Sequence, residues 1–345
     1  MDIGVVGLGR MGLNIALRLL RDGHRVMVHN RSPEPVAVAV EAGAEAAETL
    51  EAFVDGLEGP RVIWVMLPAG QVTDDHVDEL LAVLEAGDLL ADGSNGLWTD
   101  ALAQAERARQ RGVGFVDVGV SGGVWGLENG FSLMAGGDAA HVARLEPALR
   151  SLAPTPQTGW GHVGPVGSGH FVKMVHNGIE YGMMQAFAEG FAILQAQREW
   201  SASDDETTEH ALDLGQVAAI WRSGSVVQSW LLDLAAEVLE ARPDLGGIAP
   251  VVPDSGEGRW TVDAAVRLRV PAPVIAAALF QRFASQDDVG FADRLLSALR
   301  GQFGGHPVQG DAGSAGAFAG QITADGTIEP VPGGVRTEGA STRPD

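Results

Sequence analysis

The most constraining feature of the sequence is the alternation of short apolar runs with segments of helical spacing in its first half. The run DIGVVG at 2–7 ends in glycine, and NIALRLLRDG at 14–23 follows it with the apolar spacing of a helix. Further apolar runs that end in turn residues stand at 25–30, 61–67, 88–93, 114–119 and 132–137, with helical patterns between them. Strands that alternate with helices favour an α/β fold with a parallel, doubly wound sheet of the Rossmann type.

The pattern changes after Pro156, where the segments read as helical. Helical spacing recurs at 169–197, 215–241, 261–269, 273–286 and 289–300, and an acidic surface loop is expected at 201–210. Residues 307–345 are rich in Gly, Pro, Ala and acidic side chains, and within them QITADGTIE at 321–329 carries the D-G turn of a small hairpin. We therefore expect a Rossmann-type domain at 1–155, an all-α domain at 156–306 and a C-terminal tail at 307–345.

Charge and composition narrow the classes of partner. The chain has 45 acidic and 23 basic residues, a net charge of -22, and no cysteine. This charge argues against a nucleic-acid or anionic-membrane surface, and an anionic substrate needs a local cationic pocket. A salt-rich cell and a GC-rich genome are both open explanations of the acidity. Because the N-terminus enters a strand at once, without a signal-like segment, a cytoplasmic protein is expected.

The turn after the first strand carries the spacing G-x-G-x-x-G, in GLGRMG at 7–12. Gly7 allows the tight turn, Gly9 lets the backbone approach a pyrophosphate, and Gly12 lets helix and strand pack closely. The strand before it and the helix after it give the context that a dinucleotide site requires, since the helix N-terminus meets the phosphate charge. A purely structural βα turn is the alternative.

The end of the second strand bears on the choice of coenzyme. A carboxylate there would bind the ribose hydroxyls of NAD, but this chain has Asn30, Arg31 and Ser32. An arginine can bind a 2′-phosphate and stack on adenine, which favours NADP. A solvated arginine at a strand end is the alternative, and NAD stays possible.

GHFVKMVHNGIEYG at 169–182 contains Lys173, the only lysine of the chain. A helix would place on its face four further polar side chains within roughly 140° of arc: His176, Asn177, Glu180 and Tyr181. A buried lysine can lose its proton in a protein, whereas an arginine cannot. A lysine kept at this position alone therefore indicates a site of proton exchange. The alternative is a solvated polar face with a Lys–Glu pair.

Together these segments resemble the 6-phosphogluconate dehydrogenase family, in its short form with one helical repeat, within the β-hydroxyacid dehydrogenase superfamily. The resemblance extends from residue 1 to about residue 306. The matching motifs are GLGRMG, NRS, LPAG (67–70), DGSN (92–95), VSGG (120–123), GHFVKMVHNGIEYG, SGEGRWT (255–261), LFQRFAS (279–285) and RGQFGGH (300–306). The lysine segment is highly specific to the family, and the glycine turn is not.

The resemblance implies a set of site residues and a nicotinamide coenzyme, NADP or NAD, without a metal. The implied catalytic residues are Lys173, Glu180 and Asn177. The implied cofactor-binding residues are Gly7, Leu8, Gly9, Arg10, Met11, Gly12, Asn30, Arg31, Ser32, Leu67, Pro68, Ala69 and Asn95. The implied substrate-binding residues are Asn95, Ser121, Gly122, Gly123, His176, Asn177, Tyr181, Arg259, Arg282, Arg300 and His306.

The implied reaction is the oxidative decarboxylation of 6-phosphogluconate to ribulose 5-phosphate, in the pentose phosphate pathway and gluconate utilisation. Unprotonated Lys173 would take the C3 hydroxyl proton as a hydride leaves for the nicotinamide. The resulting 3-keto acid would lose CO2, and Glu180 would protonate C1. A homodimer or homotetramer is implied, in which Arg300 and His306 reach the neighbouring subunit's site.

This chain departs from the family pattern at several positions. Arg259 replaces a phosphate-site lysine, Gln228 stands where relatives often have arginine, and Pro68 stands where long-form relatives have lysine near the cofactor. The second helical repeat of the long form is missing. Two other readings stay open. One is another β-hydroxyacid dehydrogenase, of the 3-hydroxyisobutyrate or glyoxylate type, and the other is a non-catalytic NADP-binding protein.

Overall fold

The computed structural model describes residues 1–202, 212–287, 289–304, 320–322 and 328–330. These residues fall into two compact units. The first contains Met1–Ala249 and Pro253–Gln281, and the second contains Pro250–Val252 and the described residues from Arg282 onward. The candidate site lies in the first unit, so the fold of that unit decides its geometry.

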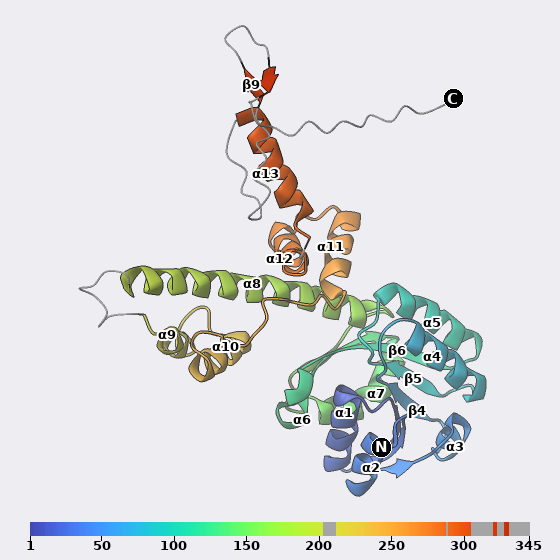
Figure 1. Cartoon of the computed structure of the whole chain (residues 1–345). Coiled ribbons are helices and arrows are strands. Elements are labelled where there is room, and N and C mark those ends of the chain that lie inside the picture. The colour runs from blue at the N-terminus through green and yellow to red at the C-terminus, as the bar shows by residue number, and fades with distance from the viewer. Residues whose placement is uncertain (203–211, 288, 305–319, 323–327, 331–345) are drawn as a thin grey trace, which may run out of the picture. The chain divides into compact units, whose positions relative to one another are not determined.

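An eight-stranded sheet forms the N-terminal part of the first unit (Figure 1). Its strands run in the order β3-β2-β1-β4-β5-β6-β7-β8, and neighbours are parallel except for β6 and β7. The strands are β1 (Asp2–Val6), β2 (Arg25–His29), β3 (Glu45–Ala46), β4 (Val62–Val65), β5 (Leu89–Asp92), β6 (Gly114–Ser121), β7 (Ser132–Gly137) and β8 (Trp160–Gly164). The strand order reverses between β1 and β4, and open α/β sheets bind their ligands at such a switch point.

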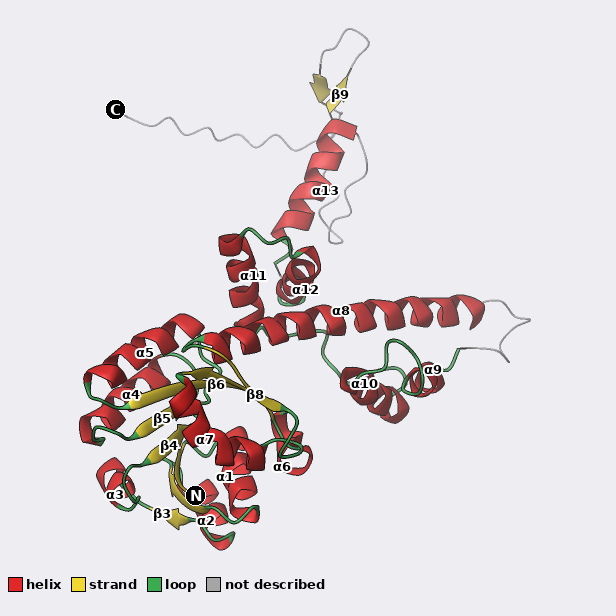
Figure 2. Ribbon diagram, turned by 180° about the vertical axis from the view of Figure 1, so that it is seen from behind, coloured by secondary structure: helices red, strands yellow, loops and turns green. Residues whose placement is uncertain are grey.

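Helices cover both faces of this sheet (Figure 2). They are α1 (Arg10–Arg21), α2 (Pro33–Glu41), α3 (Leu50–Asp55), α4 (Gln71–Val83), α5 (Trp98–Gln110), α6 (Gly126–Asn129) and α7 (Ala139–Leu152). Successive strand residues feed opposite apolar cores: Val62 and Trp64 join one, and Ile63 and Val65 join the other. This alternation explains why β4 reads as a continuous apolar run.

The rest of the first unit is helical. Helix α8 (Ser168–Ala202) is 35 residues long and begins against the sheet. Along it pack α9 (Leu214–Trp221), α10 (Trp230–Ala241) and α11 (Glu257–Leu268). Helix α12 (Pro273–Ala284) starts in the first unit, and its last residues belong to the second. The second unit also contains α13 (Phe291–Gly304) and the strands β9 (Gly320–Ile322) and β10 (Ile328–Pro330).

The expected fold class is confirmed: a Rossmann-type doubly wound sheet is followed by helices. Strands β3 and β8 were not expected, and β8 lies beyond residue 155, where the first domain was expected to end. The helical segment expected at 215–241 is two helices, separated by a break that contains Gly224 at φ 76°. The expected tail hairpin has its two antiparallel strands, β9 and β10, and its turn lies outside the described residues, as does nearly all of the acidic loop at 201–210. None of the described helices is long and apolar enough to cross a membrane.

Candidate active site

Loops at one edge of the sheet bring the expected cofactor residues together. Because β1, β2, β4, β5 and β6 are parallel, the loops after them meet at the same edge. These loops hold Gly7–Gly12, Asn30–Ser32, Leu67–Ala69, Asn95 and Ser121–Gly123. The fold thus places the expected cofactor residues, and the expected substrate turn at Ser121–Gly123, at one edge of the sheet.

The glycine turn fits a dinucleotide phosphate. Gly7 has φ 90°, and a methyl group there would lie 2.5 Å from the Met66 carbonyl oxygen. A methyl group on Gly12 would lie 1.9 Å from the Gly7 carbonyl oxygen, so only glycine lets α1 approach the turn. Gly9, just before α1, faces open space with no atom within 4 Å of an added methyl group. An anion could therefore approach the N-terminus of this helix closely.

Asn30 ties the end of β2 to the glycine turn. Its side-chain oxygen accepts a hydrogen bond from Leu8 N (2.9 Å), and its side-chain nitrogen donates to the Ser32 carbonyl oxygen (2.9 Å). Arg10 and Arg31 are both exposed. Asn30 thus shapes the loop, and the two arginines are the cations of this edge that can meet a phosphate.

A second amide fixes the loop after β5. Asn95 has φ 56°, which an asparagine adopts more readily than most residues. Its side chain both donates to Val120 O (2.8 Å) and accepts from Val120 N (2.8 Å). Ser121, next along β6, leads into Gly122 and Gly123, both at positive φ. Asn95 therefore holds the loop after β5 against the turn after β6.

The start of α8 is anchored on the sheet by a buried carboxylate. Asp117 on β6 accepts hydrogen bonds from Gly167 N (2.6 Å) and His170 N (2.8 Å), which lie at the beginning of the helix. Burial raises the pKa of Asp117, against the opposing effect of these bonds and of the His170 charge. His170 is buried as well, and its Nε2 lies 3.2 Å from the Asp92 carbonyl oxygen.

Glycines bring α8 into direct contact with the strands beneath it. A methyl group on Gly119 of β6 would lie 2.5 Å from the Cβ of Lys173. One on Gly169 of α8 would lie 2.4 Å from the carbonyl oxygens of Asp117 and Met134. The backbone of α8 therefore fixes the Lys173 side chain relative to the strand ends.

Lys173 is 6% exposed and is held by its own helix. Its ammonium nitrogen donates to the side-chain oxygen of Asn177, one turn later. Burial lowers the pKa of Lys173, and the charges of Glu180 and Glu257 oppose that shift. A lysine in this environment can serve as a base, because part of the cost of its deprotonation is removed by desolvation.

The other expected residues of α8 lie on the same face. His176 Nδ1 lies 3.1 Å from the Asn177 side-chain oxygen and 3.9 Å from a Glu180 carboxylate oxygen. The side chains of His176 and Glu180 are 44% and 37% exposed. Lys173 is thus the buried end of a row in which His176, Asn177 and Glu180 reach solvent, whereas Tyr181 is buried.

Asp254 links two of the expected phosphate-binding residues. It was not singled out from the sequence, yet its side chain is only 6% exposed. One of its oxygens accepts from the Tyr181 hydroxyl (3.2 Å), and the other lies 2.6 Å from Arg259 Nε. Ser255 Oγ also lies 3.2 Å from the Tyr181 hydroxyl. Asp254 therefore orients a phenol and a guanidinium beside α8.

Three further expected residues belong to the second unit or lie outside the described residues. Arg282 in α12 and Arg300 in α13 belong to the second unit. His306 lies outside the described residues. Their assignment to the substrate stays a prediction.

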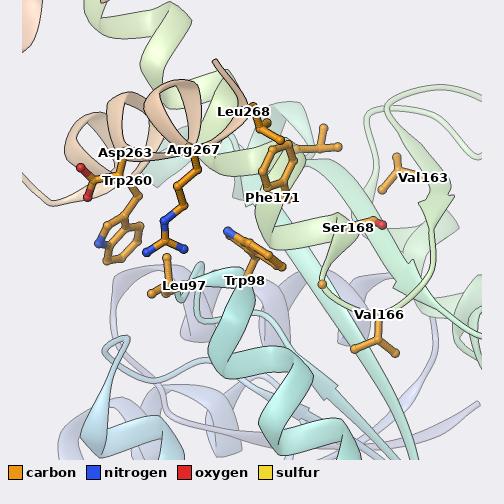
Figure 3. Close-up of a pocket in the computed structure, with 13 residues that line it drawn as sticks. Leu97, Trp98, Val163, Val166, Ser168, Phe171, Trp260, Asp263, Arg267 and Leu268 are labelled. Atoms are coloured by element: carbon orange, nitrogen blue, oxygen red, sulfur yellow. The ribbon is translucent and has the colours of Figure 1, made fainter. Parts of the chain in front are cut away.

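A separate apolar pocket of about 580 Å³ lies beside the start of α8 (Figure 3). Its walls include Trp98 of α5, Phe171 of α8 and Trp260 of α11, with Arg267 projecting between the two indoles. None of the residues expected in the site lines this pocket. The polar row on α8 and this apolar pocket are therefore distinct features.

Comparison with known proteins identifies the family. Residues 2–162 match the NAD binding domain of 6-phosphogluconate dehydrogenase, and residues 169–290 match its C-terminal domain. An NAD(+)-dependent, decarboxylating 6-phosphogluconate dehydrogenase of Haloferax volcanii is 41% identical over 309 residues, covering 89% of this chain and 98% of the relative. A decarboxylating 6-phosphogluconate dehydrogenase of Synechococcus elongatus is 39% identical over 298 residues, covering 82% of this chain but only 61% of the relative.

A solved structure agrees with these matches. The 6-phosphogluconate dehydrogenase of Plasmodium falciparum, described in its apo form and in complexes with NADP+ and with 6-phosphogluconate, superposes with a TM-score of 0.74 at 27% identity. The superposition covers 91% of this chain and 67% of the other. The chain therefore belongs to the 6-phosphogluconate dehydrogenase family of NAD(P)-dependent oxidoreductases.

Proposed function

We propose that this chain oxidises 6-phospho-D-gluconate to D-ribulose 5-phosphate and CO2, as a step of the pentose phosphate pathway and gluconate utilisation. The observation that carries the proposal is the buried Lys173, bonded to Asn177 and sharing a helix face with Glu180. The names of the relatives at 41% and 39% identity support the reaction.

In this proposal Lys173 is first a base and then an acid. Burial favours its neutral form, which takes the proton of the substrate's C3 hydroxyl. The bound nicotinamide supplies the acceptor for the hydride that leaves C3. Lys173 is then an ammonium and polarises the new C3 carbonyl, so that the 3-keto acid loses CO2 without a metal. Asn177 keeps the amine in one orientation throughout, since its side chain is bonded to Nζ.

Glu180 completes the reaction. Loss of CO2 leaves an enediol that needs a proton at C1. Glu180 lies two turns after Lys173 and is partly exposed, so it can exchange protons with solvent between turnovers. His176 and Asn177 would position substrate hydroxyls from the same face.

The proposed substrate orientation follows the cations and the glycine turns. The sugar carboxylate would bind at Ser121–Gly123, beside Asn95. The phosphate would bind near Tyr181 and Arg259, which Asp254 holds in place. Arg282, Arg300 and His306 would complete that phosphate site.

We infer that NADP is the preferred coenzyme. Arg10 and Arg31 are exposed at the edge where the coenzyme would bind, and β2 is followed by Asn30 rather than a carboxylate. The Haloferax volcanii relative is named as NAD(+)-dependent, so the preference of this chain has to be measured with both coenzymes. We further propose the domain organisation 1–155, 156–306 and 307–345, in which residues just past the first boundary add β8 to the sheet. A cytoplasmic location and a homodimer or homotetramer are also proposed.

The reaction can be tested directly with the purified chain. Reduced coenzyme should accumulate on addition of 6-phosphogluconate, with one CO2 and one ribulose 5-phosphate for each coenzyme reduced. 3-Hydroxyisobutyrate and glyoxylate serve as comparison substrates, with oxidised and reduced coenzyme respectively. Faster turnover of either comparison substrate would replace the proposed reaction by a related one. Coenzyme binding without turnover of any of the three would indicate a binding protein.

A further inference from the structure

Helix α11 packs against α8 at the level of the catalytic row. Thr261 Oγ1 lies 2.8 Å from the carbonyl oxygen of Met174 on α8 and 2.8 Å from that of Glu257 on its own helix. A methyl group on Gly258 would lie 2.4 Å from Tyr181 Cε2. The first turn of α11 is therefore fixed against the turns of α8 that follow Lys173.

Glu257 is the first residue of α11 and leaves a carboxylate oxygen buried at this junction. Among the described residues, its Oε2 is shielded from solvent and has no hydrogen-bond partner. A buried carboxylate oxygen without a partner is costly, and native structures usually have a reason for keeping one. Such an oxygen is available to a proton donor or a positive charge that is present only at some stage of a reaction.

The charged surroundings of Lys173 are sparse. On α8 its titratable neighbours are His176 and Glu180, both partly exposed, and Tyr181 is bonded to Asp254. From the sheet, Gly119 of β6 lies against it, and the carboxylate of Asp117 is bonded to the start of α8. From α11 comes Glu257, whose charge acts on Lys173 together with that of Glu180. Lys173 forms no ion pair within the part of the chain that the structure describes.

We propose that Glu257 is a positioning residue for Lys173, whose buried carboxylate is the counter-charge of the ammonium form that arises during turnover. This role rests on the proposed function. An ammonium in a desolvated site needs a negative charge nearby, and Asn177 supplies only a neutral acceptor. Glu257 supplies that charge from a second helix. It stabilises the protonated form of Lys173 that arises during turnover, whereas burial favours the neutral form that acts as the base.

The single lysine makes the proposal measurable without substrate. Protein labelled with 13C and 15N in lysine gives one side-chain signal, from Lys173, so its protonation can be followed against pH by NMR without assignment. In Glu257→Gln the titration midpoint should fall by about one pH unit, as for loss of an opposite charge at short range. Glu257→Asp keeps the charge and should stay closer to the unmodified protein. Asp263→Asn removes a charge from an exposed position of the same helix and should leave the midpoint in place.

A second neutral variant, Glu257→Thr, keeps the test possible if Glu257→Gln does not fold. Unfolded protein is recognised because its lysine titrates at the ordinary pKa of a lysine side chain. An unchanged midpoint in both neutral variants, or an equal fall in Asp263→Asn, overturns the proposal. Activity gives a separate readout: the acid limb of kcat/KM should move to lower pH with the NMR midpoint. If the protein does not turn over 6-phosphogluconate but the midpoint moves, the reaction is wrong and the pairing stands. If it is active and the midpoint does not move, only the pairing is wrong.

Discussion

Single residues in this site are oriented by hydrogen-bonded partners as well as by packing. Asn177 is bonded to the amine, Asn95 to the backbone at Val120, and Asp254 to both Tyr181 and Arg259. Each partner reduces the number of orientations open to the group it binds. Reacting groups that are already oriented lose less entropy on reaching the transition state.

Replacement of Lys173 by methionine should separate activity from coenzyme binding. Lys173→Met removes the base but keeps the length and apolar character of the side chain. Turnover of 6-phosphogluconate should fall by a factor on the order of 10²–10⁴ or more, as is typical for a positioned acid or base. Coenzyme affinity, measured by calorimetry, should stay unchanged, because the expected coenzyme residues lie on the sheet loops. Near-normal turnover would remove Lys173 from the mechanism.

The same substitution should stabilise the fold in a pH-dependent way. Burial lowers the pKa of Lys173 in the folded state, so below the unfolded-state pKa the unfolded chain binds a proton that the folded chain binds less well. This cost to folding is largest below the folded-state pKa and vanishes above the unfolded-state pKa. Lys173→Met should therefore raise Tm at neutral pH. The unfolding free energy should rise by about 1.4 kcal/mol for each pH unit between the folded-state and unfolded-state pKa of Lys173. The gain should disappear near pH 11. A gain independent of pH would mean that methionine simply packs better.

Replacement of Arg31 should reveal the coenzyme preference. A charge-assisted bond to the 2′-phosphate contributes about 1.5–3 kcal/mol, or roughly a 10- to 150-fold preference for NADP. Arg31→Ala should lose most of that preference and leave kcat/KM for NAD nearly unchanged. Arg198→Ala, near the C-terminal end of α8, is a control that should affect neither coenzyme. A native protein that prefers NAD would show that the loop after β2 was misinterpreted.

The sequence predicted the residues that share α8 but missed those that reach it from elsewhere. Lys173, Asn177 and Tyr181 lie on one helix, and helical periodicity alone relates their directions. Asp254 and Glu257 act on that face only because α11 packs against α8, and local periodicity carries no information about that contact. The signal available was their place at the start of a helix, which charged residues occupy for many other reasons.

At the scale of elements, a buried carboxylate of the sheet binds the first turn of α8. Its first turn has backbone N–H groups that no helical carbonyl can satisfy, and Asp117 of β6 accepts two hydrogen bonds there, from Gly167 N and His170 N. The helix and the strand are thereby held at one register. Since Lys173 lies one turn further on, that register also sets the position of the amine.

Replacement of Asp117 should therefore weaken both the fold and the site. In Asp117→Asn one side-chain oxygen can accept only part of what two carboxylate oxygens accept, so one N–H is left unpaired. The unfolding free energy in denaturant should fall by about 1–3 kcal/mol. The exposed Asp55→Asn should leave it within about 0.5 kcal/mol. If Asp117→Asn is as stable as the control, relief of the buried charge outweighs the lost bond.

The features of the sheet that the sequence did not predict leave no periodic pattern in the residues that form them. Strand β3 has only two residues, and three of the five residues of β8 are glycine or histidine. Neither strand therefore forms the apolar run that marks a buried strand. The antiparallel pairing of β6 with β7 leaves no local trace either, because direction depends on how the chain returns between them. Long runs such as those of β1, β4 and β6, by contrast, were predictable since both of their faces are covered by helices.

At the scale of the whole molecule, the net charge of -22 means that any site for an anionic sugar phosphate needs cationic side chains around it. Among the expected substrate-binding residues that the structure describes in the first unit, the cations are Arg259 and, when protonated, His176. The proposed phosphate site needs Arg300 and His306 as well, and the proposed assembly would supply them from a neighbouring subunit. Large exposed apolar side chains on α8, such as Ile179 and Ile193, agree with an interface on this helix.

Mixed oligomers should test whether the site is shared between subunits. Lys173→Met and Arg300→Ala should each be inactive alone, since one lacks the base and the other a phosphate cation. If subunits are mixed and allowed to exchange, a hybrid contains one intact site, so part of the activity should return. Light scattering should find a dimer or tetramer. Exchanged mixtures that stay inactive, or a fully active monomer, would place the whole site in one chain.

The single buried lysine has one more consequence, for proteolysis. A protease that cuts only after lysine has one target in the chain, the bond between Lys173 and Met174, in the middle of the anchored part of α8. Both residues are buried, so cleavage requires that this helix open from the sheet. The rate at which fragments 1–173 and 174–345 accumulate thus reports how often α8 opens locally. In this protein, a digestion that yields only two fragments measures the integrity of the proposed active site.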